Sequence, residues 1–72
     1  MSARPQKRSL TLKGHRTSVS LEEEFWVEFR RIAKSRGLAF NVLASEIDAA
    51  RGTEAGLASA IRVFVLNELR GR

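Results

Sequence analysis

A short stretch of alternating residues runs directly into a strongly amphipathic segment near the start of this chain. In residues 15–21 (HRTSVSL), successive side chains of an extended backbone would point to opposite faces. One face takes Thr17, Val19 and Leu21. The other face takes Arg16, Ser18 and Ser20, which are polar but carry little charge. The alternation therefore predicts a β-strand with one face for a core and one face for solvent or a ligand.

Helices are predicted after this strand, with glycines marking where they stop. The first covers about 21–36, because Ser20 and Glu23 have capping-box spacing and Gly37 is a C-terminal stop. Its apolar residues share one arc, with acids at its start and bases at its end, as the helix dipole favours. Helical spacing predicts a second helix at about 40–50 and, after a glycine-containing break, a third at about 55–70.

The third predicted helix is apolar around most of its circumference, so it must be buried on most sides. A chain of 72 residues without cysteine has neither a large core nor disulfides, which makes a second copy the simplest cover. The predicted fold is mainly α with one short β-strand region, as an intertwined homodimer. Its predicted dimer core consists of Val19, Leu21, Phe25, Phe29, Ile32, Leu43, Ile47, Ile61, Phe64 and Val65.

The net charge of +5 is concentrated at the N-terminus. Residues 1–16 contain five bases and no acid, whereas the remaining residues contain eight of each. Residues 1–8 have too few apolar side chains for their burial to offset the conformational entropy lost on ordering. We therefore expect a disordered basic arm at 1–8, followed by a folded domain at 9–70. Such an arm beside a neutral body is typical of a segment that binds nucleic acid or, less directly supported, an anionic membrane surface.

The residue inventory argues against an enzyme. The chain has one histidine and no cysteine, so neither a metal cluster nor a nucleophilic triad can be assembled convincingly. Its five glycines do not have the spacing of a phosphate-binding loop, and we expect no cofactor. The apolar run at 57–69 is interrupted by polar residues and is too short to span a bilayer, and no signal-peptide pattern is present. We therefore expect a cytoplasmic binding protein.

A strand needs a neighbour for its backbone hydrogen-bonding groups. The same strand of a second chain would supply one and make an antiparallel ribbon that fits the major groove of B-DNA. Alternatively, Lys13 and Gly14 could form a tight turn that pairs residues 9–12 with the strand in a hairpin. Two such hairpins would make a four-stranded sheet that is too broad for the groove, so the arm would have to detach.

The segment HRTSVSLEEEFWVEFRRIAKSRGLAFNVLASEI resembles the ribbon-helix-helix family of the Arc, MetJ and CopG type. GHRTSVSLE, with the later EID and AIRVFVLNEL, is similar to a largely uncharacterised bacterial subgroup. Relative to the two helices of the basic family, the third predicted helix would be an extra C-terminal helix. The resemblance implies a homodimer that inserts its ribbon into the major groove and reads bases with Arg16, Ser18 and Ser20. It also implies a phosphate anchor at the start of the second helix, near Phe40 and Asn41. Further phosphate contacts would come from Lys7, Arg8, Lys13 and His15.

These features predict a sequence-specific DNA-binding transcriptional regulator, such as a repressor, acting as a homodimer or a higher oligomer on double-stranded DNA. The alternative is a dimeric protein-interaction module, antitoxin-like or adaptor, with only non-specific affinity for DNA. Its motivation is the weakly charged outward face of the strand and the apolar third helix. A membrane is not an expected partner, because the apolar face of the first helix is needed for the core.

Overall fold

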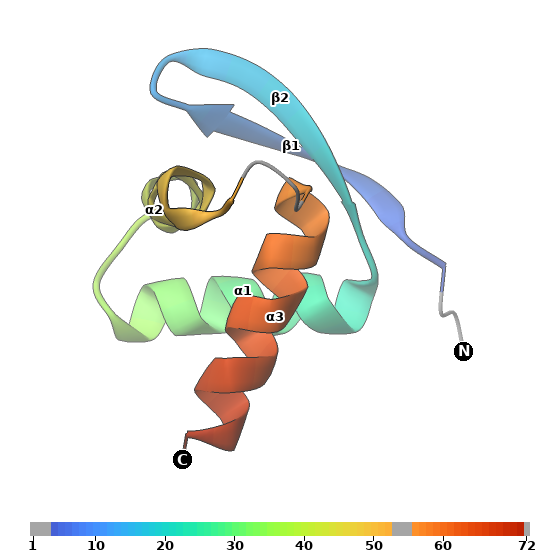
Figure 1. The fold of residues 1–72 in the computed structure, drawn as a ribbon, viewed down its shortest axis with the longest axis vertical. Coiled ribbons are helices and arrows are strands. Elements are labelled where there is room, and N and C mark those ends of the chain that lie inside the picture. The colour runs from blue at the N-terminus through green and yellow to red at the C-terminus, as the bar shows by residue number, and fades with distance from the viewer. Residues whose placement is uncertain (1–3, 53–55, 72) are drawn as a thin grey trace.

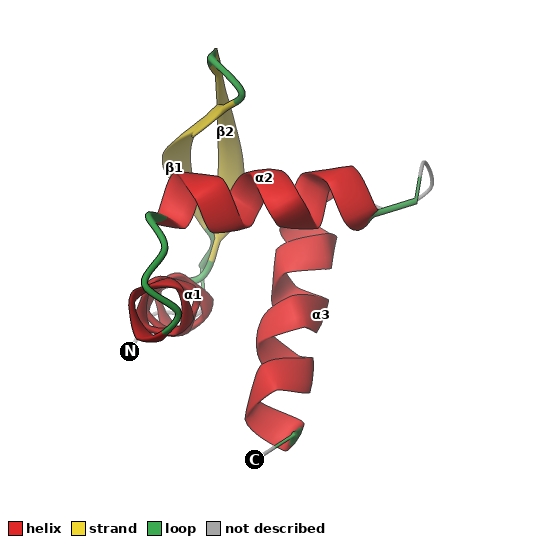
Figure 2. Cartoon of the chain, turned by 90° about the vertical axis from the view of Figure 1, so that its left-hand side faces the viewer, coloured by secondary structure: helices red, strands yellow, loops and turns green. Residues whose placement is uncertain are grey.

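The computed structural model describes residues 4–52 and 56–71. A β-hairpin is followed by three helices (Figure 1). The elements are β1 (Gln6–Leu12), β2 (His15–Leu21), α1 (Glu23–Ser35), α2 (Phe40–Ala50) and α3 (Leu57–Arg70). The hairpin lies across the helices, with α2 packed against β1 and α3 packed against β2. Figure 2 shows that α2 and α3 cross each other, while α1 is seen end-on beside them.

The hairpin settles which strand pairs with β2. The strands are antiparallel and in register from Gln6 opposite Leu21 to Leu12 opposite His15. Lys13 (φ 52°) and Gly14 (φ 85°) form the two-residue turn, and positive φ at both positions is what a type I′ hairpin turn requires. The strand that pairs with β2 therefore comes from the same chain.

The prediction of a disordered arm at residues 1–8 is wrong for residues 6–8, because β1 begins at Gln6. Residues 1–3 of that arm lie outside the described residues. The ordering has two physical causes: Leu10 is buried in the core, and Arg8 packs on Trp26 and pairs with Glu23. Sequence reasoning treated Arg8 only as a charge, although its long aliphatic stem can cover apolar surface.

The core lies between the inner face of the hairpin and the three helices. Its buried residues are Leu10, Val19, Leu21, Phe29, Ile32, Ala33, Leu43, Ala44, Ile47, Ile61 and Val65. Phe25 and Phe64 are partly buried against this cluster. Thr17 is on the same face of β2 as Val19 and Leu21 but is exposed, and it lines a shallow pocket together with residues of α2 and α3.

The ends of α1 differ in how they are capped. The expected capping box is wrong: Ser20 stays in β2, and Glu22 is the N-cap residue without a side-chain cap hydrogen bond. The C-terminal stop at Gly37 is confirmed. Gly37 has a φ of 72°, its N–H donates to the carbonyl of Lys34, and the N–H of Leu38 donates to that of Ala33. These two bonds define a Schellman motif.

One face of α3 is buried in this chain, through Ile61 and Val65. Its other apolar side chains are substantially exposed: Val63 by 54%, Leu66 by 47% and Leu69 by 44%. The expectation of burial on most sides is therefore not met within one chain, and these three residues form what we call the outer face of α3. No helix in the described part of the chain is long and apolar enough to cross a membrane.

Candidate nucleic-acid interface

The hairpin turns a continuous polar face away from the helices. Directly paired residues of an antiparallel ladder lie on the same face, so β1 contributes the partners of the three outward residues of β2. We call this set the outward face: Lys7, Ser9, Thr11, Arg16, Ser18 and Ser20. All six are exposed, and the set contains two cations, four hydroxyls and no acid.

These side chains suit the edges of base pairs. An arginine can bond to both O6 and N7 of guanine, and serine or threonine can donate to or accept from several bases. The sequence analysis found Arg16, Ser18 and Ser20, and the structure brings these three together on one side of β2. It missed Ser9 and Thr11 as members of the same face. A turn at Lys13 and Gly14 sets the register of β1 against β2, and that register could have identified these two residues.

Side chains from the helices cap both edges of the hairpin. On the β1 edge, the backbone N–H of Thr11 donates to Oδ1 of Asn41 at 2.9 Å. On the β2 edge, Nη2 of Arg62 donates to the carbonyl oxygen of Ser20 at 3.1 Å. Each of these bonds occupies one outward-pointing backbone group and ties its strand to a helix. The side chain of Asn41, expected at a phosphate, thus positions β1.

The residues expected at phosphates are distributed over several surfaces. Lys7 belongs to the outward face, and Lys13 lies exposed at the hairpin tip. Arg8 and His15 lie on the inner side of the sheet, where His15 is exposed and Arg8 is packed against α1. Phe40 begins α2 after Ala39, which provides no side-chain cap, and the Phe40 ring lies edge-on to Trp26. The structure therefore does not bring these residues into one cluster.

Glu22, the first acid after β2, forms an ion pair with Arg62. Oε1 of Glu22 accepts a hydrogen bond from Nε of Arg62 at 2.9 Å. This hydrogen bond from Arg62 holds the pKa of the Glu22 carboxyl below its ordinary value. Arg62 therefore pairs with the acid that follows β2, while another of its nitrogens donates to Ser20 at the strand edge.

The described residues contain no group of three or more histidine, cysteine, aspartate or glutamate side chains that could hold a metal ion. The predicted core residues lie in the interior of a single chain, as described above, and none of them contributes to the outward face. The candidate interface therefore consists of the hydroxyls and cations of the outward face of the hairpin.

Comparison with known proteins agrees with this architecture. A family model described as a ribbon-helix-helix domain matches residues 5–69, which includes both strands and nearly all of α3. No curated protein and no solved structure was found to match the chain. Because the family model covers most of the sequence, the chain belongs to the ribbon-helix-helix family.

Proposed function

We propose that this protein is a sequence-specific DNA-binding transcriptional regulator that acts as a homodimer and inserts a two-stranded β-ribbon into the major groove. Ribbon-helix-helix domains are in general DNA-binding regulators, are typically not enzymes, and typically dimerise. The proposal goes further in assigning sequence recognition to the outward face. It would act as a cytoplasmic repressor by occupying the DNA that it recognises.

One observation carries this proposal: the outward face has hydroxyls and cations but no acid. A surface for a polyanion must avoid uncompensated carboxylates, and a surface that discriminates bases needs short hydrogen-bonding side chains beside a bidentate arginine. Two strands about 4.8 Å apart also fit a groove about 12 Å wide. The six side chains thus combine the charge, the chemistry and the width that base reading requires.

In our proposal both strands of the inserted ribbon come from one chain, and the dimer presents one hairpin to each half-site. The alternative is an intertwined dimer in which β2 pairs with β2 of a second copy. Two intact hairpins joined in that way would be too broad for the groove, so β1 would have to detach. Detachment would expose Leu10 and break the ion pair between Arg8 and Glu23. We therefore favour the intact hairpin.

Replacing Arg16 tests base reading. The Arg16→Ala variant should bind the preferred duplex more weakly by about 1–3 kcal/mol and lose discrimination at one base position. Arg31→Ala is the matched control, because it also removes one cation, but from a side chain that pairs with Glu28 on α1. Equal losses in both variants, or unchanged discrimination in Arg16→Ala, would contradict base reading by the outward face.

A reversible lock tests whether the hairpin stays closed on DNA. Ser9 and Ser18 are directly opposite each other, at a separation that a disulfide can bridge, and the natural chain contains no cysteine. We expect the oxidised Ser9→Cys/Ser18→Cys variant to bind DNA within about twofold of its reduced form, because locking leaves an already formed ribbon unchanged. Binding that disappears on oxidation and returns on reduction would show that β1 must detach.

The outer face of α3 supports a second candidate function, a dimeric protein-interaction module of the antitoxin or adaptor kind. Exposed apolar residues along one helix are typical of surfaces that bind another protein. In that case, DNA binding would be weak, insensitive to sequence and steeply dependent on salt, and Arg16→Ala would leave partner binding intact. The DNA measurements described here separate this candidate from the regulator.

A further inference from the structure

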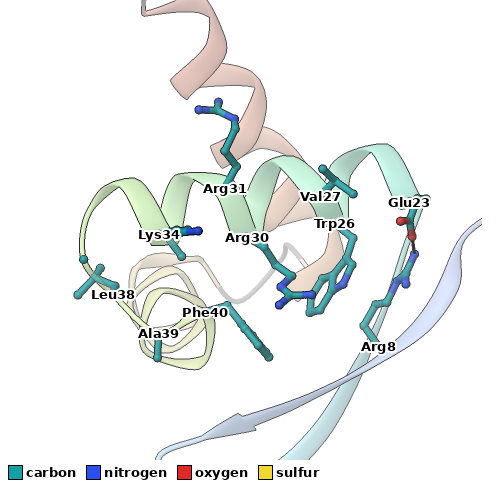
Figure 3. A pocket seen from close by; sticks show the side chains of 12 residues that line it. Arg8, Glu23, Trp26, Val27, Arg30, Arg31, Lys34, Leu38, Ala39 and Phe40 are labelled. Carbon is teal, nitrogen blue, oxygen red and sulfur yellow. Dashed lines mark hydrogen bonds and ion pairs between the residues drawn. The ribbon is translucent and has the colours of Figure 1, made fainter.

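A groove of about 870 Å³ lies between β1, α1 and the start of α2 (Figure 3). Four cations line it, Arg8, Arg30, Arg31 and Lys34, against the single acid Glu23. The rings of Trp26 and Phe40 also line it, edge to face with centroids 5.3 Å apart. The groove is distinct from the outward face, because Arg8 is on the inner side of the hairpin. It is a second cationic surface, with aromatic walls.

Arg30 is held inside this groove by aromatic rings rather than by an acid. Its guanidinium carbon lies 5.3 Å from the centroid of Phe40 and 6.0 Å from that of Trp26. In the described part of the chain, no hydrogen-bond acceptor or carboxylate pairs with it. The next residue, Arg31, points to the other side of α1 and pairs with Glu28 (Figure 3). The donors of Arg30 are therefore available to an anion.

Arg8 adds a second guanidinium with an unsatisfied donor. Its side chain is only 14% exposed, its guanidinium carbon lies 5.5 Å from the Trp26 ring centroid, and Nη2 donates to Glu23 at 2.7 Å. Its Nε is buried and has no hydrogen-bond partner. Buried donors without an acceptor are uncommon in folded proteins, so Arg8 has hydrogen-bonding capacity that the described residues do not use.

We propose that this groove binds a nucleotide, with the phosphate near Arg8 and Arg30 and the base against the Trp26 and Phe40 rings. Guanidinium groups bind phosphate oxygens through paired, charge-assisted hydrogen bonds. Flat bases stack on aromatic side chains irrespective of base identity. The N-terminus of α2, which lacks a side-chain cap at Ala39, adds backbone donors at one end of the groove. Neither lone phosphate nor a lone base would use all of these groups.

The only tryptophan of the chain lies in this groove, so its fluorescence reports occupancy directly. We would titrate the protein with adenosine monophosphate, adenosine and inorganic phosphate at constant ionic strength, and repeat each titration by calorimetry. The monophosphate should give a saturable change in Trp26 emission. Adenosine and phosphate should each bind at least about tenfold more weakly, since each satisfies only part of the site.

Two arginine variants, one inside the groove and one outside it, make the test specific. Arg30→Ala should weaken binding of the monophosphate about tenfold or more, because it removes a charge-assisted partner. Arg51→Ala removes the same charge outside the groove, from a residue that follows α2 and pairs with Asp48, and should change binding by less than about twofold. Circular dichroism and thermal unfolding confirm that both variants fold.

Three results would overturn the proposal. The first is the absence of a saturable response to adenosine monophosphate, by both fluorescence and calorimetry. The second is an equal loss of binding in Arg30→Ala and Arg51→Ala, which would indicate general charge attraction. The third is a response to duplex DNA but not to the monophosphate, abolished by Arg30→Ala, which would assign the groove to the DNA backbone. None of these results bears on base reading by Arg16, so the nucleotide site and the proposed function fail independently.

Discussion

Leu10 connects the hairpin to the rest of the fold, and its removal gives a quantitative prediction. The side chain is 2% exposed and belongs to the core cluster, although β1 is the first strand of the chain. Leucine-to-alanine replacements at buried positions remove hydrophobic contacts and leave a cavity, at a cost of roughly 2.7–5 kcal/mol. Because β1 is an edge strand that can relax, we expect Leu10→Ala to lower the free energy of unfolding by about 3 kcal/mol.

The measurement is urea and thermal unfolding followed by circular dichroism at a fixed protein concentration, so that any dimerisation affects all variants equally. For a domain of this size, about 3 kcal/mol corresponds to a fall in Tm of roughly 12–24 °C. Ser9→Ala, at the neighbouring exposed position, is the control and should change stability by less than about 0.5 kcal/mol. A loss below about 1 kcal/mol in Leu10→Ala would refute the integration of β1 into the folded domain.

Two further predictions concern the ends of α1. Gly37→Ala should lower the free energy of unfolding, measured by thermal unfolding, by about 1 kcal/mol, because a φ of 72° disfavours any side chain. Gly52→Ala is the control and should be nearly neutral. Equal effects of the two replacements would argue against the Schellman motif. The pKa of Glu22 is lower in the folded protein than in the unfolded one, so its pairing with Arg62 stabilises the fold at neutral pH. This contribution should be lost as the pH falls below about 4.5, the ordinary pKa of the carboxyl. Glu22→Gln should therefore flatten the dependence of unfolding free energy on pH in that range. An unchanged dependence in this variant would contradict the stabilising role of the pair.

The helices could be predicted because their signals are local. Apolar side chains recur at helical spacing in all three helical segments. Gly37 ends the first helix, because glycine readily adopts the positive φ found there. The cap of α1 was predicted wrongly for a reason that is not local. Ser20 has the right spacing to Glu23, but its backbone is committed to the ladder with Lys7 and its carbonyl accepts from Arg62.

The hairpin could be recognised only as an alternative. Lysine is an unusual residue for the first position of a type I′ turn, so Lys13 weakened the signal that Gly14 provided. Alternation in β2 correctly grouped the three residues that β2 contributes to the outward face. The contribution of β1 depended on the register between the two strands. Contacts between distant residues, such as Arg8 with Trp26 or Arg62 with Glu22, leave no periodic pattern in a sequence. The groove beside α1 therefore could not be predicted.

The most direct test of our account is selection of preferred duplexes from a random DNA library, followed by fluorescence anisotropy on the selected duplex and a scrambled one. Both duplexes would be titrated across a salt series that includes about 0.15 M. If the outward face reads bases, selection yields a defined motif, and the protein binds it about a thousandfold or more tightly than the scrambled duplex. Selection without a motif, with equal and salt-sensitive affinity for both duplexes, would contradict sequence-specific regulation by this hairpin.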